Sequence, residues 1–380
     1  MKLSANRPTE CTIDLDALGF NLRSIRNFIG GGVKVMAVVK ANAYGHGAAE
    51  CSKRLENDGV DWLGVALVEE AVELRLAGIK TPVLCLGSFW PGQETAVIEH
   101  NITPAIFDLD RAASLNRAAA KLDRSINIHI KIDTGMGRIG FPFRDVTAFA
   151  RELKRFTNLN VEGLMTHFAS ADDPENDFTN EQMRRFAEVV SIFHENGFRP
   201  SIIDMANSPG AVAFTDSRAS LVRIGGILYG LGDDVLPRGF ERPELKPVMS
   251  LTTRIAFLKT IGKGESVGYG QTFIATRDSV IATIPIGYHD GLRRSLSNKG
   301  RVLVGGEFAP IVGRISMDWT TIDVTDRPKV ELGDEVVIIG PQGNNRRTAE
   351  IMAAECDTIS YAITCGIGSR VPRVFKCESI

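Results

Sequence analysis

Short hydrophobic runs alternate with amphipathic stretches between about residue 33 and residue 230 of the chain. Each run is rich in β-branched residues or leucine and is bounded by Gly, Pro, Asn or Asp, which is typical of buried parallel strands. The eight runs cover residues 33–40, 62–68, 82–87, 102–108, 126–133, 161–168, 202–207 and 221–229. Eight strands alternating with helices predict an α/β fold, a closed (β/α)8 barrel of the TIM type, rather than an open sheet.

Two of the intervening stretches have a clear helical period. Residues 145–156 place apolar side chains at positions 146, 149, 150 and 153, which is the spacing of one helix face. Residues 179–194 carry a second apolar face of the same kind. Both stretches are therefore predicted to be helices that cover the barrel.

After about residue 240 the pattern changes to short strands separated by Gly-rich turns. The predicted strands cover residues 248–261, 279–285, 301–304, 309–325 and 335–339, and only residues 348–355 have a helical pattern. Residues 11–15 alternate like an edge strand. The sequence predicts a barrel domain over residues 13–240 and a β-rich domain over residues 241–380, to which residues 1–12 can be added. The linker is expected near residues 233–247, where Gly, Pro and charged residues cluster.

The composition favours a small-molecule partner. The chain has 380 residues and a formal net charge of −2, so it offers no broad electrostatic attraction for nucleic acid or an anionic membrane. No stretch reaches the roughly 18 consecutive apolar residues of a membrane span, and residues 1–7 lack the apolar region of a signal peptide. The six cysteines are scattered without a Cys-x-x-Cys pair, which predicts reduced thiols in a cytoplasmic protein.

Reactive side chains gather where the predicted barrel strands end, the face that carries the active site in barrels of this type. Lys40 ends the first run, where burial favours the neutral amine that attacks a carbonyl. Ser208, Gly225 and Gly226 lie near the seventh and eighth strand ends, the usual phosphate site of such barrels. A reactive lysine and a phosphate cradle at one barrel mouth suggest pyridoxal 5'-phosphate bound as a Schiff base.

At these residues the chain resembles the alanine racemases, a family of barrel-type enzymes that depend on pyridoxal phosphate. Residues 37–47, AVVKANAYGHG, are similar to the cofactor-lysine signature of that family. Matching segments continue through residues 131–138, 166–169, 206–208, 223–230, 268–272, 287–291, 313–318, 361 and 370–373. The resemblance therefore covers nearly the whole chain.

The resemblance implies an isomerase that interconverts L-alanine and D-alanine by a two-base mechanism through a pyridoxal phosphate aldimine. Lys40 would hold the cofactor and serve as the base for D-alanine, and Tyr269 would act on L-alanine from the opposite face. In the family the second base comes from a partner subunit, so a homodimer with shared active sites is also implied. The reaction would supply D-alanine for peptidoglycan or serve alanine catabolism.

The resemblance assigns the remaining site residues to the cofactor or the substrate. The implied cofactor-binding residues, besides Lys40, are Tyr44, His167, Asn207, Ser208, Arg223, Gly225, Gly226 and Tyr361. The implied substrate-binding residues are Arg138, Met317 and Tyr288. Lys131 matches a position that is often carbamylated in the family, where the added anion orients Arg138.

Arg223 carries a mechanistic hypothesis of its own. An arginine cannot accept a proton, so a pyridine nitrogen that faces Arg223 stays neutral and the substrate carbanion is short-lived. Rapid reprotonation then favours racemisation over transamination. The family pattern also links Tyr269 to the cofactor through His167 and Arg223.

Three positions depart from the family pattern. Asp204 stands where a histidine commonly precedes the Asn-Ser pair, Trp319 follows the Met-Asp pair, and Ala362 replaces an acidic residue after Tyr361. These departures leave the strictness for alanine over serine or other amino acids open. The histidines have no mutual metal-ligand spacing, so no metal site is predicted.

Other functions remain to be weighed. A pyridoxal phosphate carrier without turnover would be a single barrel, which the second domain with Tyr269 disfavours. A basic-amino-acid decarboxylase would need an acidic residue at the position of Arg223. A metal-dependent barrel hydrolase lacks a His/Asp cluster with ligand spacing.

Overall fold

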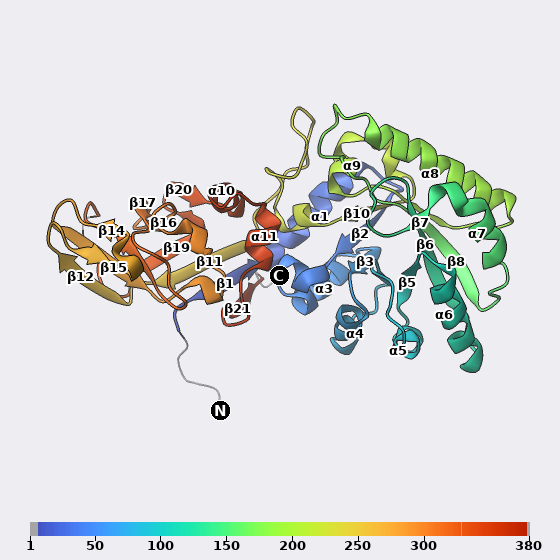
Figure 1. Ribbon diagram of the computed structural model, residues 1–380, viewed down its shortest axis with the longest axis horizontal. Helices are drawn as coiled ribbons and strands as arrows, with labels where there is room; N and C mark the ends of the chain where they lie inside the picture. Colours follow the sequence, from blue (N-terminus) through green and yellow to red (C-terminus); the bar gives the residue numbers. More distant parts are fainter. Residues whose placement is uncertain (1–6, 328, 378–380) are drawn as a thin grey trace. The chain divides into compact units, whose positions relative to one another are not determined.

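A computed structural model describes residues 7–327 and 329–377, and the chain divides into two compact units (Figure 1). The barrel unit comprises Leu18–Ala43 and Gly47–Leu245. The β-rich unit comprises the chain up to Ala17, Tyr44–His46 and the chain from Lys246 onward. The predicted fold class, a (β/α)8 barrel followed by a separate β-rich domain, is confirmed.

The barrel unit is a closed ring of parallel strands. Within the described residues the ring runs β2–β3–β4–β5–β6–β8–β9–β10, and β10 pairs with β2 to close it. The strands are β2 (Lys34–Val38), β3 (Trp62–Val65), β4 (Val83–Cys85), β5 (Thr103–Ile106), β6 (Ile126–Asp133), β8 (Leu159–Met165), β9 (Ile202–Asp204) and β10 (Leu221–Ile224), and the short β7 (Phe141–Pro142) pairs with the end of β6.

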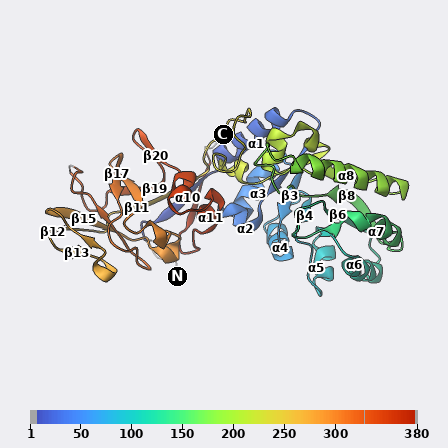
Figure 2. The same cartoon turned by 45° about the horizontal axis from the view of Figure 1, so that its top comes forward.

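Helices surround this ring on the outside, as two views of the molecule show (Figures 1 and 2). They are α1 (Leu15–Ile29), α3 (Ala48–Asn57), α4 (Val68–Leu76), α5 (Glu94–Glu99), α6 (Leu109–Lys121), α7 (Val146–Leu153), α8 (Phe178–Glu195) and α9 (Ser208–Ala213). The two helices predicted from their apolar faces are confirmed as α7 and α8, and their predicted faces are buried.

Most predicted hydrophobic runs are longer than the strands inside them. β6 coincides with its run, but β10 stops at Ile224 and Gly226–Tyr229 form a 3-10 turn. Val68, the last residue of the second run, already begins α4. The runs extend further because residues beyond the ladder, such as Tyr229, are also buried, and hydrophobicity reports burial rather than strand pairing.

The β-rich unit contains one large mixed sheet and two small ones. The large sheet runs β17–β16–β19–β11–β1–β21, with β20 beside β19, and the small ones are β12–β15–β18 and β13–β14. The strands are β1 (Glu10–Asp14), β11 (Met249–Arg254), β12 (Phe257–Ile261), β13 (Ser266–Val267), β14 (Phe273–Ile274), β15 (Ser279–Ile284), β16 (Arg301–Val304), β17 (Glu307–Pro310), β18 (Thr320–Asp323), β19 (Glu335–Gln342), β20 (Asn345–Arg347) and β21 (Arg373–Lys376).

Two predictions for this unit are wrong. The strand at residues 11–15 is not an edge, because β1 pairs with β11 on one side and β21 on the other. Alternation reports that one face is buried and says nothing about pairing partners far along the chain. Residues 348–355 are also not the only helix: α10 (Ala349–Glu355) is followed by α11 (Ser360–Cys365), which is too short for its period to show.

The interior of the barrel is filled by a layer of side chains from successive strands. Seven apolar residues form it: Met36, Trp62, Leu84, Ala105, Met165, Ile202 and Leu221. His129 on β6 belongs to the same layer, since it pairs in register with Ala105 and its ring centroid lies 5.3 Å from that of Trp62. Burial lowers the pKa of His129 to about 3, with a further contribution from the positive charge of Arg223, so this imidazole is neutral.

No helix among the described residues has the length and apolar character that crossing a membrane requires.

Candidate active site

A polar layer lies one step above the apolar layer, toward the carboxyl ends of the strands. Residues two apart on a strand share a face, so Lys131 follows His129, Asp204 follows Ile202, and Arg223 follows Leu221 into the interior. In register, Lys131 on β6, Met165 on β8 and Asp204 on β9 lie side by side, so the polar side chains adjoin the apolar layer. The alternation of the strands therefore places charged side chains at the end of a barrel where catalytic groups are usually found.

Arg223 is the most constrained of these residues. Its side chain is 4% exposed, and one terminal nitrogen, Nη1, donates to Oδ1 of Asp204. The other, Nη2, donates to the carbonyl oxygens of Thr166 (2.8 Å) and Met205 (3.2 Å). The Nε–H makes no hydrogen bond within the described part of the chain, so it is available to a ligand.

His167 is held in one protonation state by Arg223. Nη2 of Arg223 lies 3.1 Å from Nδ1 of His167, and because a guanidinium has only donors, Nδ1 must accept. Burial, followed by the positive charge of Arg223, lowers the pKa of His167 well below its ordinary value. The imidazole is therefore neutral, with its proton on Nε2.

Lys131 is buried among cations. Burial is the largest cause that lowers the pKa of its ammonium to about 7, and the charges of Arg223, Arg138 and Lys40 lower it further, while Asp204 opposes them. Its Nζ lies 3.5 Å from the carbonyl oxygen of Leu86. The neutral amine is therefore far more populated near neutral pH than in an ordinary lysine.

Arg138 lies on an exposed turn that follows β6. The carboxylate of Asp133 accepts hydrogen bonds from the backbone N–H groups of Gly135 and Gly137 and so fixes this turn. The Arg138 side chain donates no hydrogen bond to any described residue, and its charge acts on Lys131 and His167. An exposed guanidinium beside the polar layer can bind an anionic ligand.

Lys40 begins a left-handed turn directly after β2. The segment α2 (Lys40–Tyr44) contains four consecutive residues with positive φ, from Ala41 (53°) to Tyr44 (53°), and none of them is glycine. A left-handed residue other than glycine costs about 1–2 kcal/mol, so this turn requires support from outside. Oε1 of Glu70 supplies it by accepting the backbone N–H of Ala41 at 2.7 Å.

A set of small and polar groups lies after β9 and β10. Oγ of Ser208, a buried side chain, accepts the backbone N–H of Gly225 at 3.1 Å, and Gly226 follows at the start of the 3-10 turn. Asn207 caps α9, because its Oδ1 accepts the backbone N–H of Gly210 at 3.0 Å. The Oδ1 atom of Asn207 is therefore engaged in this cap.

Tyr44 and Tyr361 lie together within the β-rich unit. Their ring centroids are 5.2 Å apart in an edge-to-face arrangement with an interplanar angle of 80°. Burial raises the pKa of Tyr44 above its ordinary value, so its phenol keeps the proton and can donate.

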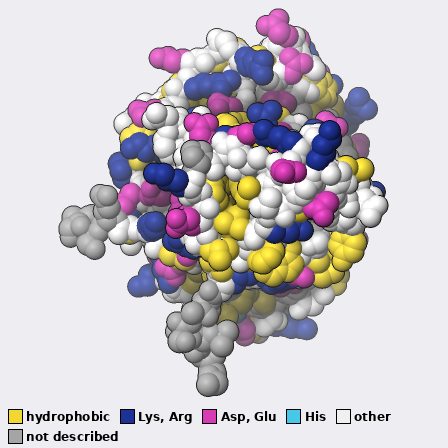
Figure 3. All heavy atoms as spheres, turned by 90° about the vertical axis from the view of Figure 1, so that its left-hand side faces the viewer, with side chains coloured by type: hydrophobic (Ala, Val, Ile, Leu, Met, Phe, Trp, Pro, Cys, Tyr) yellow, Lys and Arg dark blue, Asp and Glu magenta, His cyan; other side chains and the backbone are white. Residues whose placement is uncertain are grey.

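Tyr269, Met317 and Tyr288 are all exposed on the β-rich unit. Tyr269 is 72% exposed, and lies between Gly268 and Gly270, both with positive φ. It shares a pocket of about 290 Å³ with Arg314 and Trp319. Figure 3 shows hydrophobic side chains gathered on one face of the molecule, at the end where Figure 1 labels β12 and β15. Such exposed apolar area is typical of an interaction surface.

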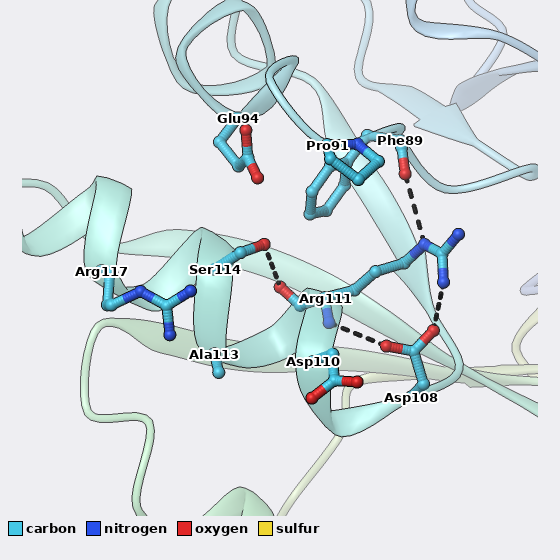
Figure 4. A pocket seen from close by; sticks show the side chains of 9 residues that line it. All are labelled: Phe89, Pro91, Glu94, Asp108, Asp110, Arg111, Ala113, Ser114 and Arg117. Carbon is cyan, nitrogen blue, oxygen red and sulfur yellow. Dashed lines mark hydrogen bonds and ion pairs between the residues drawn. The ribbon is translucent and has the colours of Figure 1, made fainter.

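A second pocket, of about 470 Å³, lies away from the polar layer beside the start of α6 (Figure 4). Arg111 donates to the carboxylate of Asp108 and to the carbonyl oxygen of Phe89 (3.2 Å), so its cation is already compensated. This pocket contains none of the predicted site residues. In the described chain, no three His, Cys, Asp or Glu side chains are grouped as a metal ion would require.

Sequence reasoning missed two residues that support this site. Asp204 was noted only as a departure from the family pattern, although an acid at an inward-facing position of a buried strand signals a buried partner. No sequence pattern pointed to Glu70, because its contact with Ala41 joins the starts of two helices that are 29 residues apart along the chain.

Together, the fold and the polar layer define a two-domain barrel enzyme with a lysine at the end of its first barrel strand. Comparison with known proteins identifies the family. The sequence profile of the alanine racemase N-terminal domain matches residues 13–233, and that of the alanine racemase C-terminal domain matches residues 248–375. The chain therefore belongs to the alanine racemase family, as its motifs suggested.

Individual relatives agree over the full length. An alanine racemase of Halothermothrix orenii is 43% identical, with 99% of each chain covered, and one of Geobacter sp. strain M21 is 44% identical over 97% of this chain and 99% of its own. The crystal structure of alanine racemase from Bacillus anthracis with bound L-Ala-P superposes with a TM-score of 0.93, at 36% identity, covering 99% of this chain and 97% of the other. The protein is thus a racemase, an isomerase, rather than a carrier, decarboxylase or hydrolase.

Proposed function

We propose that the protein interconverts L-alanine and D-alanine with pyridoxal 5'-phosphate held by Lys40, and that Lys40 and Tyr269 of a partner chain act as opposed bases. The observation that carries the proposal is the polar layer itself. Lys131, His167 and Arg223 converge at the strand ends of the barrel, where Lys40 leaves β2 on a supported turn. The proposal places the protein in the cytoplasm, which agrees with six free cysteines.

The donor set of the chain fits pyridoxal phosphate. The Nε–H of Arg223 makes no hydrogen bond within the described residues. It can donate one to the pyridine nitrogen of the cofactor without transferring its proton. Ser208, Gly225, Gly226, Tyr44 and Tyr361 would hold the phosphate, for which hydroxyl and backbone N–H donors are suited. When bound, the cofactor acidifies the α-hydrogen of the amino acid attached to it. A structure of alanine racemase from Bartonella henselae, 30% identical with a TM-score of 0.87, holds covalently bound pyridoxal phosphate.

Two residues of the barrel unit would orient the substrate. The exposed guanidinium of Arg138 would bind the alanine carboxylate. The amine of Lys131, with its pKa lowered to about 7, can add to CO2 and release a proton, which leaves a carbamate anion. That anion would hold Arg138 in place.

Inversion requires proton transfer on both faces of the α-carbon. Lys40 would serve one face, and the phenol of Tyr269, which is 72% exposed on its own chain, would reach the other face from a partner chain. Met317 and Tyr288, exposed on the same unit, would line the substrate entry. This arrangement makes the protein a homodimer with shared active sites, whose product supplies D-alanine for peptidoglycan or whose reverse reaction serves alanine catabolism.

The test is incubation with L-alanine in deuterium oxide, followed by chiral chromatography and mass spectrometry. We expect D-alanine that carries deuterium at the α-carbon, because each base returns a solvent-derived hydron. D-alanine without α-deuterium, or no D-alanine, would contradict the proposal.

Tyr269→Phe separates the two bases. D-alanine should still exchange its α-hydrogen for deuterium through Lys40 while keeping its configuration, and the rate of inversion should fall by at least about a hundredfold. If the variant inverts alanine at the wild-type rate, Tyr269 is not the second base.

A further inference from the structure

Asp204 is a carboxylate placed in the interior of the barrel. Its side chain has no exposed surface, and it ends β9 at the level of Met165 on β8 and Leu221 on β10. Strands on both sides therefore separate it from solvent, and burying an ionised carboxylate in such a place is costly unless a cation accompanies it.

The surrounding charges show which cations accompany it. Oδ1 of Asp204 accepts a hydrogen bond from Nη1 of Arg223. Burial raises the pKa of Asp204, and the charges of Arg223 and Lys131 oppose that rise. The charges of Arg138 and Lys40 act on Lys131. Asp204 is therefore paired with Arg223 and is also acted on by the charge of Lys131.

Stability alone does not explain the ion pair. A buried ion pair is weak evidence for stabilisation, because desolvation of both groups can exceed their attraction. Oδ2 of Asp204 in addition has no hydrogen-bond partner among the described residues. A buried ion pair with one carboxylate oxygen left without a partner at this position points to a role in the site.

That role follows from the geometry of Arg223. Asp204 fixes Nη1 of the guanidinium, and Thr166, Met205 and His167 take Nη2. A planar guanidinium held at both ends cannot rotate, so its Nε–H keeps one direction.

We infer that Asp204 is a positioning residue of the active site, which orients the guanidinium of Arg223 and offsets its charge. This inference rests on the proposed function. Asp204 acts through Arg223 on the bound cofactor: it keeps the Nε–H donor aligned with the ring and keeps the uncompensated positive charge of the interior low.

The test compares Asp204→Asn with Asp61→Asn. Asp204→Asn keeps the shape and one oxygen acceptor but removes the charge. Asp61→Asn removes another ion pair of the barrel unit, the one to Arg26 at 2.8 Å, at a half-buried position outside the polar layer. The holoenzyme of each is measured for kcat and KM with alanine, for the absorbance spectrum of the bound cofactor, and for the dissociation constant of pyridoxal phosphate.

We expect Asp204→Asn to lower kcat by about tenfold or more with less than a threefold change in KM, since misaligned site groups lower turnover. The cofactor spectrum should shift and its dissociation constant should rise, whereas Asp61→Asn should match the wild type in all four measurements. Equal behaviour of the two variants overturns the inference.

A double-mutant cycle on the dissociation constant distinguishes positioning from a structural role. In an Arg223→Gln background, Asp204→Asn should have little further effect, because Asp204 acts through Arg223. Equal effects in both backgrounds would contradict the inference. If Asp204→Asn alone does not fold, Asp204→Ser replaces it. The cycle is then completed by the double variant that carries both Asp204→Ser and Arg223→Gln.

The outcomes for the proposed function are separate. A wild-type protein that binds pyridoxal phosphate but does not racemise alanine defeats the proposed function, while the cofactor spectrum and affinity still test Asp204.

Discussion

Lys131 is a lysine whose surroundings change its chemistry at neutral pH. An ordinary lysine is a neutral amine only on the order of once in a thousand molecules at pH 7. Burial, with the charges of Arg223, Arg138 and Lys40, brings the pKa of Lys131 down to about 7. CO2 adds only to the neutral amine, and the lowered pKa therefore supports the proposed carbamylation of this residue.

We expect the carbamate of Lys131 to be present above pH 7 and to disappear as the pH falls through about 7. Below that pKa the amine is protonated and cannot add to CO2. Carbamate formation also releases a proton, so a low pH shifts this equilibrium toward the free amine as well. The measurement is a 13C NMR spectrum of the protein in 13C-labelled bicarbonate across this pH range.

Lys131→Arg is the matched control, because arginine keeps the positive charge but stays protonated. Its spectrum should lack the carbamate signal at every pH. A carbamate signal of equal size in wild type and variant would assign the modification to another lysine.

At the scale of elements, the left-handed turn after β2 depends on the first turn of α4. Glu70 accepts the backbone N–H of Ala41 with one oxygen, and with the other it accepts those of Ala66 (2.8 Å) and Leu67 (3.2 Å). One carboxylate thus caps α4 and stabilises the strained segment that follows Lys40.

Glu70→Ala is expected to lower the free energy of unfolding by about 1–3 kcal/mol, because three backbone donors lose a charged acceptor. Hydrogen exchange at residues 41–44 should accelerate, and the affinity for pyridoxal phosphate should fall by about tenfold. Mass-detected hydrogen exchange and equilibrium dialysis measure the two effects.

Glu69→Ala serves as the control. Glu69 is exposed, and its Oε1 accepts a hydrogen bond from the side chain of Gln93 at 2.9 Å, away from the turn. If both variants show the same exchange at residues 41–44, Glu70 does not support the turn.

At the scale of the whole molecule, we propose that each site is shared between two chains. Lys40 lies in the barrel unit and Tyr269 in the β-rich unit, where the phenol is exposed. An isologous dimer would supply each site with a lysine from one chain and a tyrosine from the other.

Mixing inactive variants tests this sharing. When Lys40→Ala and Tyr269→Phe chains are unfolded together and refolded at equal concentration, half of the dimers are mixed, and each has one intact site. Roughly a quarter of the wild-type racemase activity should return. Activity no higher than the sum of the separate variants would mean that each site is built from one chain.

The local pattern of the chain was sufficient for most elements. The run at residues 126–133 became β6 without change, and residues 301–304 became β16, because buried strands are continuous apolar segments. The pairing of strands could not be predicted from the local pattern. β1 lies inside its sheet rather than at an edge, and its neighbours β11 and β21 are too distant in the sequence for a local pattern to show them.

The candidate site likewise has residues that the sequence could predict and contacts that it could not. Lys40, Ser208 and Arg223 could be proposed from their positions at strand ends, and their motifs led to the family. The contacts of Asp204 with Arg223 and of Glu70 with Ala41 could not, because each depends on strand register or on the approach of two helix starts.

The sequence by itself determined the alternation of strands and helices, the two-domain order and the family of this protein, because these follow from periodicity and from motifs contiguous along the chain. Only the tertiary structure decided which charges meet in the barrel. Residues 19 apart, such as Asp204 and Arg223, become ion-pair partners through the stagger of neighbouring strands, and that stagger is set by packing of the whole ring rather than by any local segment.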